Sequence, residues 1–356
     1  MNVRPEVDLT IAVHSPVRPI ERAVRSVLEG TDAVVRVTVA VHEIDPRLIA
    51  KKLTWAGDRV RLLPVRDGMR SPAGPFNAGM AAAEAPWISI MGSDDTLAPH
   101  AIDSWLARAQ RTGAEVVIPR VQMVEGRAIP TPPTRPGRVS FLDGVRDRLS
   151  YRSAPLGLLS RGRFGHLRFP VGVPSGEDIP FVTALWFSGA RITYDRRGPA
   201  YLGHADASDR TSGVARPVDV EFTWLRVLLT DPVYRGLSAE QRAAVVAKSL
   251  RINLFGAVLS RNTPSAWLDG DRTALAAVAD TLVREGDGIH EVLSRRDRTL
   301  LDAILDPGSP IEELIELARA RRRFLSAGAL LPRRLSHTLH REAPLRMAAA
   351  TALQLL

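Results

Sequence analysis

Short runs of apolar residues alternate with amphipathic segments through the first half of the chain. The apolar, β-rich runs predict strands at residues 9–13, 35–41, 60–65, 87–91, 115–124 and 192–194. The segments between them predict helices at residues 20–28, 46–55, 77–84, 99–111 and 178–188. This alternation predicts an open α/β sheet with helices on both faces. Ligands of such sheets bind at the carboxyl ends of the strands, so we expect functional loops after Val13, Val41 and Met91.

The pattern changes near Pro217. From there to Leu356 only helix patterns occur, near residues 219–230, 238–260, 271–285, 289–305, 310–325 and 336–355. We therefore place a domain boundary near residue 215. The expected organisation is an α/β domain over residues 1–215 and an all-helical domain over residues 216–356.

Composition limits the chemistry that the chain can perform. Of its 356 residues, 45% are hydrophobic and 24% are charged, which is ordinary for a globular protein and excludes wholesale disorder. The absence of cysteine excludes disulfides, thiolate nucleophiles and cysteine metal sites. The N-terminal apolar run is short and preceded by Glu6 and Asp8, and no stretch approaches the ~18 uninterrupted apolar residues of a membrane helix. We therefore expect a soluble, cytoplasmic protein.

The charge balance favours anionic partners. Lys and Arg total 48 against 39 Asp and Glu, a net charge of +9. Nucleotide phosphates, lipid head groups, anionic polymers and nucleic acid all fit that surplus. Arginines gather between residues 319 and 346, where a solvated helix face explains them most simply. Aromatic residues make up only 5% and do not interleave with this cluster, so we expect no nucleic acid partner and keep a basic nucleic-acid-binding protein only as the weakest alternative.

Two acidic pairs carry the strongest chemical signal. Asp94 and Asp95 directly follow an apolar strand, where they repel one another unless a cation or hydrogen bonds compensate. This arrangement indicates a divalent metal site for a diphosphate, and the structural alternative is that both residues cap a turn and a helix. Glu177 and Asp178 stand at a loop-to-helix transition, and His204 follows an apolar run. Alone, these three are compatible with a helix cap and a solvated histidine.

The order of these features resembles the family 2 glycosyltransferases of the GT-A fold. The segment LTIAVHSP resembles that family's first strand. PFNAGMAAAEAPWISIMGSDDTLAPHAIDSWL resembles its Asn-x-Gly helix, central strand and Asp-rich motif, and SGEDIPFVTALWFSGARITYDRRGPAYLGH resembles its Glu-Asp catalytic helix. The resemblance covers roughly residues 7–212. It implies the mixed sheet of a nucleotide-diphospho-sugar transferase, flanked by helices and followed by the helical domain.

The resemblance also implies a reaction: metal-dependent, inverting transfer of a sugar from a nucleotide-diphosphate donor, most simply a UDP-sugar, to an acceptor hydroxyl. The acceptor class that it implies is a cell-surface polysaccharide or glycopolymer precursor. Asp94 and Asp95, assisted by His204, would hold Mn²⁺ or Mg²⁺ against the leaving diphosphate. Asp178 would be the general base and Glu177 would orient the acceptor. Donor contacts are implied for His14, Ser15, Pro16, Glu43, Asn77 and Asp94.

Several positions depart from the family's pattern. Gly92 replaces the first Asp of the common Asp-x-Asp-Asp motif, and His42 with Glu43 replaces the acidic pair usual after the second strand. Phe76 stands where an arginine commonly precedes the Asn-x-Gly element. These departures leave the nucleobase open and keep a catalytically inactive, nucleotide-sugar-binding relative as the alternative. The Gln/Arg-x-x-Arg-Trp element of processive enzymes is absent, which predicts transfer of single residues.

The C-terminal tail joins a basic segment to an apolar one. After Arg333 the arginines give way to an apolar stretch from Met347 to Leu356. Such a tail suits peripheral contact with an anionic membrane at the inner face. It equally suits docking on the helical domain or a homo-oligomer interface, and we favour these two.

Overall fold

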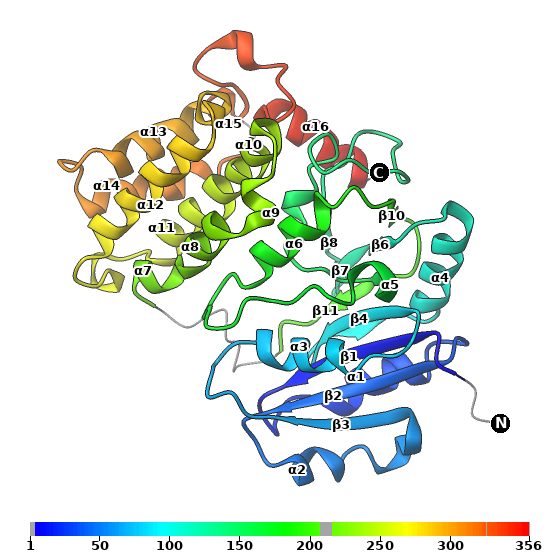
Figure 1. Cartoon of the computed structure of the whole chain (residues 1–356). Helices are drawn as coiled ribbons and strands as arrows, with labels where there is room; N and C mark the ends of the chain where they lie inside the picture. The colour runs from blue at the N-terminus through cyan, green and yellow to red at the C-terminus, as the bar shows by residue number, and fades with distance from the viewer. Residues whose placement is uncertain (1–3, 207–215, 325, 356) are drawn as a thin grey trace. The chain divides into compact units, whose positions relative to one another are not determined.

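The computed structural model describes residues 4–206, 216–324 and 326–355, and the chain divides into two compact units (Figure 1). The first unit comprises Met1–Thr131, Gly137–Leu142 and Arg152–Ser212. The second comprises Pro132–Pro136, Asp143–Tyr151 and Gly213–Leu356. The boundary expected near residue 215 lies outside the described residues.

A seven-stranded sheet forms the centre of the first unit. Its order is β10 (Ile192–Asp195), β6 (Val116–Pro119), β9 (Leu158–Ser160), β4 (Trp87–Gly92), β1 (Val7–Val13), β2 (Val35–His42) and β3 (Val60–Val65). β9 runs antiparallel to both of its neighbours, and the other pairs are parallel. The carboxyl ends of the other six strands therefore meet at one edge. The loops after β1, β2, β3 and β4 all leave from that edge.

The first unit also contains a second, smaller sheet. It pairs β5 (Thr96–Leu97), β11 (Tyr201–Gly203), β7 (Val121–Met123) and β8 (Ala128–Ile129) in that order. β5 begins just after the acidic pair that follows β4. The antiparallel pairing of Tyr201 with Leu97 therefore brings β11 close to the acidic residues Asp94 and Asp95.

Helices cover the large sheet. They are α1 (Ile20–Leu28), α2 (Pro46–Ala50), α3 (Ala73–Ala81), α4 (Ala101–Thr112), α5 (Arg161–Phe164) and α6 (Asp178–Trp186). α1 is amphipathic: its apolar residues are buried while Glu21, Arg22 and Arg25 keep partial exposure. The predicted α/β sheet with flanking helices is confirmed, with β9 as the strand that makes it mixed.

Three predicted elements differ in their bounds. α3 starts at Ala73 instead of Asn77, because Pro75 falls in the first helical turn, where its missing N–H is not needed. The single strand expected over residues 115–124 is two strands, β6 and β7, which belong to different sheets. The helix expected over 46–55 ends at Ala50 and is followed by a 3₁₀ segment, Thr54–Arg59.

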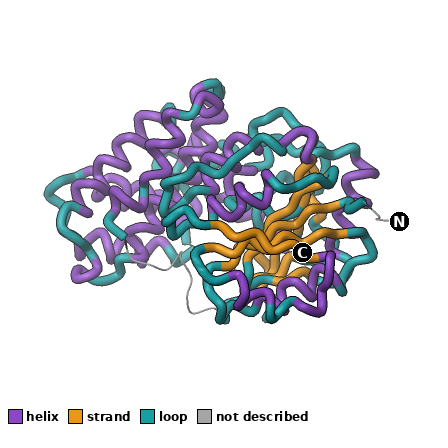
Figure 2. Tube along the Cα trace, turned by 60° about the horizontal axis from the view of Figure 1, so that its bottom comes forward, coloured by secondary structure: helices purple, strands orange, loops and turns teal. Residues whose placement is uncertain are grey.

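Helices dominate the second unit, as the pattern after residue 217 predicts, and every strand named above belongs to the first (Figure 2). The helices are α7 (Val218–Glu221), α8 (Thr223–Thr230), α9 (Pro232–Arg235), α10 (Ala239–Lys248), α11 (Phe255–Ser260), α12 (Asp271–Glu285), α13 (Arg295–Leu305), α14 (Ile311–Arg321), α15 (Ala327–Leu330) and α16 (Pro344–Leu355). The expected helix over 336–355 thus begins later, at Pro344. Gln354 of α16 donates to the Pro132 carbonyl at 2.6 Å, so the tail packs within its own unit.

The stretch Ala239–Ser260 joins α10 and α11 through a π-helical turn. By length and composition alone it is apolar enough to cross a membrane, but 67% of its apolar window is buried inside the structure. Burial of this kind is typical of a core helix in a globular unit.

Candidate active site

The acidic pair at the end of β4 lies in a tight turn. The Asp95 N–H donates to the Gly92 carbonyl at 3.4 Å, and Gly92 itself pairs with Ala12 of β1. A Cβ at residue 92 would lie 2.8 Å from Asp95 Oδ2 and 3.1 Å from Asp94 Oδ1. Glycine at this position therefore lets the two carboxylates fold back over the backbone of the strand end.

Asp95 is held by two neutral donors from the neighbouring sheet. The Tyr201 hydroxyl donates to Asp95 Oδ2 at 2.6 Å and accepts from the Gly92 N–H at 3.1 Å. The His204 N–H donates to Asp95 Oδ1 at 3.2 Å, and His204 Nε2 shares a 2.9 Å hydrogen bond with the Thr96 hydroxyl. Burial raises the pKa of Asp95 although both donors act to lower it. The structure thus brings Asp95 and His204 together, as expected, and adds Tyr201.

Asp94 faces a different partner, from the loop after β1. Arg18 Nη1 lies 2.8 Å from Asp94 Oδ2, and only 5% of the Arg18 side chain is exposed. Arg22, on α1, donates to the Asp94 carbonyl at 2.6 Å and forms a 2.6 Å ion pair with Asp206. Neither arginine is among the site residues predicted from the sequence. Their four-residue spacing at the start of a helix that follows β1 is the only signal that points to them.

The loop after β1 carries three of the residues predicted to contact the nucleotide-sugar donor. Ser15 Oγ accepts from the Val17 N–H at 3.4 Å, and the Ser15 carbonyl accepts from the Arg18 N–H at 3.3 Å. His14 and Pro16 are half-buried beside it. This tight turn sends Arg18 back toward the acidic pair.

Glu43 follows β2 with a backbone φ of 57°, in the left-handed region that few side chains adopt. Its carboxylate accepts from the Asp67 and Gly68 N–H groups at 2.7 and 2.8 Å, and these bonds lower the pKa of Glu43. His42 Nε2 lies 2.8 Å from Asp67 Oδ1. Glu43 therefore braces the loop after β3. Asp67, which is not among the predicted site residues, contacts both His42 and Glu43.

Asn77 fastens the loop that leads to α6. Its amide donates to the Phe169 carbonyl and accepts from the Phe169 N–H, both at 2.8 Å. The Phe169 ring stacks on Phe181 of α6 with centroids 4.1 Å apart. Asn77 thus positions the backbone that precedes Glu177 and Asp178.

Glu177 and Asp178 are half-buried at the start of α6. Only the short segment 187–191 separates α6 from β10, which runs in the same direction as β4. The end of α6 therefore lies near the amino edge of the sheet, and its start lies toward the carboxyl edge. This topology directs Asp178 to the same edge as Asp94 and Asp95.

Two groups of three side chains could each hold a metal ion. Within the described residues, potential ligand atoms lie within 4.8 Å of one another in two sets: Asp32, His100 and Asp103, and His42, Glu43 and Asp67. The expected ligands Asp94, Asp95 and His204 do not form such a set in that part of the chain. Asp94 and Asp95 instead turn to Arg18 and to Tyr201.

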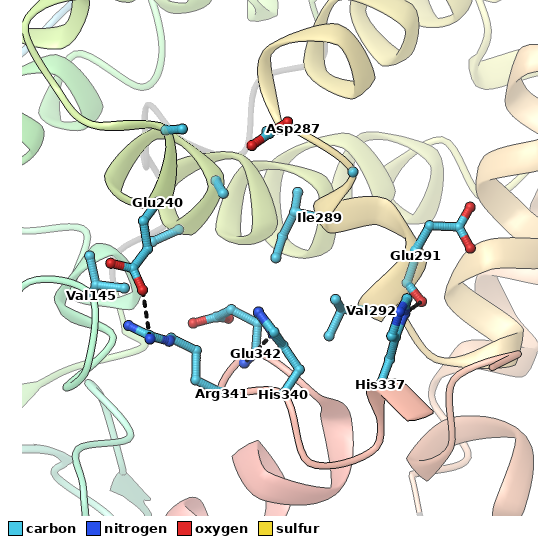
Figure 3. A pocket seen from close by; sticks show the side chains of 14 residues that line it. Val145, Glu240, Asp287, Ile289, Glu291, Val292, His337, His340, Arg341 and Glu342 are labelled. Carbon is cyan, nitrogen blue, oxygen red and sulfur yellow. Dashed lines mark hydrogen bonds and ion pairs between the residues drawn. The ribbon is translucent and has the colours of Figure 1, made fainter. Parts of the chain in front are cut away.

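The second unit has a pocket of its own. About 630 Å³ in volume, it is lined by apolar residues such as Val145, Ile289 and Val292 and by the ion pair of Arg341 with Glu240 (Figure 3). All of its lining residues belong to the second unit, so it is distinct from the acidic pairs.

Comparisons with known proteins agree with the fold. Residues 15–156 match the family model of glycosyl transferase family 2. The succinoglycan biosynthesis protein ExoO of Rhizobium meliloti (strain 1021) is 32% identical over 130 residues, which cover 35% of this chain and 36% of ExoO. The chain thus matches little more than a third of the length of that curated relative.

Solved structures extend the likeness to most of the chain. S. aureus TarS 1-349 in complex with UDP-GlcNAc has a TM-score of 0.69 at 15% identity, covering 89% of this chain and 92% of that chain. S. aureus TarS has a TM-score of 0.64 at 16% identity, covering 89% of this chain and 55% of that chain. Identities this low establish the fold alone. Residues 15–156 therefore resemble glycosyl transferase family 2, and the chain has the GT-A fold, followed by a helical C-terminal region.

Proposed function

We propose that the protein is a metal-dependent, inverting glycosyltransferase that moves single sugars from a nucleoside-diphosphate donor to an acceptor hydroxyl. One observation carries the proposal. The Asp94–Asp95 turn and the start of α6 with Asp178 lie at the same edge of a sheet whose chain matches glycosyl transferase family 2. Ligands of such sheets bind at this edge.

The donor is proposed to be a UDP-sugar. TarS has been solved with UDP-GlcNAc and with UDP, and its fold matches this chain. The contacts would come from the loops after the parallel strands, which carry His14, Ser15, Pro16, Glu43 and Asp94, and from Asn77 of α3. Participation of ExoO in succinoglycan biosynthesis supports a polysaccharide precursor as the acceptor.

The residues at the end of β4 fit a divalent cation. Carboxylate oxygens suit Mn²⁺ and Mg²⁺, and burial together with the neighbouring Asp94 carboxylate raises the pKa of Asp95. Asp94, Asp95 and His204 would hold the ion. When bound, it would supply positive charge to the departing diphosphate. Arg18, already paired with Asp94, adds a guanidinium on the same side.

Asp178 is proposed as the general base. It would accept the proton of the acceptor hydroxyl as that oxygen attacks the anomeric carbon and the bond to the diphosphate breaks. Direct displacement inverts the anomeric centre and needs only this one carboxylate. Glu177, the neighbouring N-cap residue of α6, would orient the acceptor.

A thermal-shift screen of nucleoside diphosphates and nucleotide sugars tests the donor and the metal together. With Mn²⁺, one nucleoside series is expected to raise the melting temperature, because a ligand at about 100 times its Kd adds about 2.7 kcal/mol of stability. A chelator or Asp95→Asn should remove the shift, while Asp269→Asn, an exposed position in the second unit, should keep it. A Mn²⁺-independent shift, or no shift with any donor, would contradict the proposal.

A further inference from the structure

Five arginines meet in a second pocket of the helical unit. The pocket has a volume of about 370 Å³ and is lined by Arg135, Pro136, Arg146, Arg148, Arg341, Arg346, Ala349 and Ala350. These residues come from three stretches of the second unit, 132–136, 143–151 and the C-terminal segment that ends in α16. None of the lining residues carries a negative charge.

Carboxylates outside the lining compensate only part of this charge. The ion pairs are Arg135–Asp147 at 2.6 Å, Arg341–Glu240 at 2.6 Å and Arg148–Glu342 at 3.8 Å. In the described part of the chain, neither Arg146 nor Arg346 has a carboxylate within 4.0 Å, and both are exposed. Asp143 adds a carboxylate near Arg135 and accepts from the Arg146 N–H at 2.7 Å. Among the described residues, the guanidinium groups of Arg146 and Arg346 are thus the two of the five that form no ion pair.

One of the five arginines is fixed before any ligand arrives. Arg148 is 4% exposed, and its backbone φ of 51° lies in the left-handed region. Its guanidinium donates to the carbonyls of Pro133 at 2.8 Å and Arg341 at 3.0 Å. Burial lowers the pKa of Arg148, because its charge is partly removed from water. An anion in the pocket would relieve that penalty.

We infer that this pocket binds a phosphate monoester group. A phosphate monoester carries about −1.5 to −2 charges at neutral pH, which the guanidinium groups of Arg146 and Arg346 can balance. Planar guanidinium forks bind its oxygens in pairs, and the small Ala349 and Ala350 side chains leave space for it. No aromatic ring lines the pocket, so nothing there stacks on a nucleobase. The group can belong to a phosphorylated saccharide or to a lipid head group.

Calorimetry with inorganic phosphate at physiological ionic strength tests the inference. The pocket variant is Arg146→Ala/Arg346→Ala, since both side chains are exposed and lack a carboxylate partner. The matched control is Arg226→Ala/Arg322→Ala, which removes the same charge from exposed positions outside the pocket. We expect the pocket variant to lose affinity about tenfold or more and the control to keep it. Equal loss in both variants, no loss in the pocket variant, or no binding by the wild-type chain would overturn the inference.

Vesicles separate the two sources of the phosphate. Phosphatidylcholine vesicles with and without phosphatidic acid are sedimented with the wild-type chain and both double variants. Pelleting that needs phosphatidic acid and is lost only in the pocket variant identifies a lipid head group. Phosphate binding without pelleting identifies a soluble phosphorylated ligand. Pelleting of all three proteins alike, with no pocket-dependent phosphate binding, would contradict a specific site.

Discussion

The Tyr201 hydroxyl donates a 2.6 Å hydrogen bond to the carboxylate of Asp95, although 106 residues separate them in the chain. The same hydroxyl accepts the Gly92 N–H. We expect Tyr201→Phe to lower the free energy of unfolding by about 1–3 kcal/mol, because the half-buried Asp95 carboxylate and Gly92 N–H both lose the hydroxyl that they bond. Urea denaturation measures this. Tyr194→Phe, another buried tyrosine of the first unit, is the control and should change stability by less than about 0.5 kcal/mol; equal losses would deny Tyr201 its special role.

Asp95 predicts a specific pH dependence of stability without metal. Its folded-state pKa is raised above the unfolded value near 3.8, so the folded chain binds more protons between these two values. Its contribution to stability therefore falls as pH rises through that window. We expect the difference in unfolding free energy between the wild-type chain and Asp95→Asn, measured by urea denaturation with chelator present, to fall over the same window. A wild-type minus variant difference that rises with pH would contradict the cited shift.

Arg18 links the acidic pair to the loop after β1. We expect Arg18→Met to weaken binding of a nucleoside diphosphate about tenfold, because a guanidinium beside the diphosphate is lost. Arg18→Lys should recover part of the affinity, since it keeps the charge but not the paired geometry. Calorimetry in the presence of Mn²⁺ measures both variants. An unchanged affinity with a lower melting temperature would reduce Arg18 to a structural partner of Asp94.

Gly92 is the clearest departure from the family's motif, and the structure explains why a simple restoration should fail. A Cβ there meets Asp95 Oδ2 at 2.8 Å, and Tyr201 holds that oxygen in place. Gly92→Ala should therefore cost about 1–3 kcal/mol of stability by overpacking. Gly92→Asp should destabilise at least as much and should not improve Mn²⁺ binding. Higher metal affinity with unchanged stability in Gly92→Asp would refute this explanation.

The sequence predicts the elements that have long local signals. β1, β2, β3, β4 and β10 are apolar runs, and all five are found near their predicted bounds. β5, β9 and β11 contain only two or three residues each. No periodic pattern can develop over such lengths, and their pairing depends on partners far away in the chain. The pairing of Tyr201 with Leu97 is an example.

The same reasoning explains what the sequence reveals of the site. Asp94, Asp95, Glu177 and Asp178 stand out because each acidic pair adjoins an element boundary. Arg18 does not, because in sequence it resembles any solvated arginine of a polar loop, whereas the fold buries it to 5% exposure against Asp94. Such burial follows from tertiary packing, and the local sequence carries no signal that predicts it.

The proposed mechanism requires Asp178 to act on the acceptor and Asp95 to act on the donor. The most direct measurement follows released nucleoside diphosphate and donor affinity, with Mn²⁺ present, for the wild-type chain, Asp178→Asn and Asp95→Asn. The account predicts that Asp178→Asn loses about 10²–10⁴-fold in turnover with donor affinity nearly unchanged, whereas Asp95→Asn loses affinity. Equal losses of affinity and turnover in Asp178→Asn, or full turnover in that variant, would contradict it.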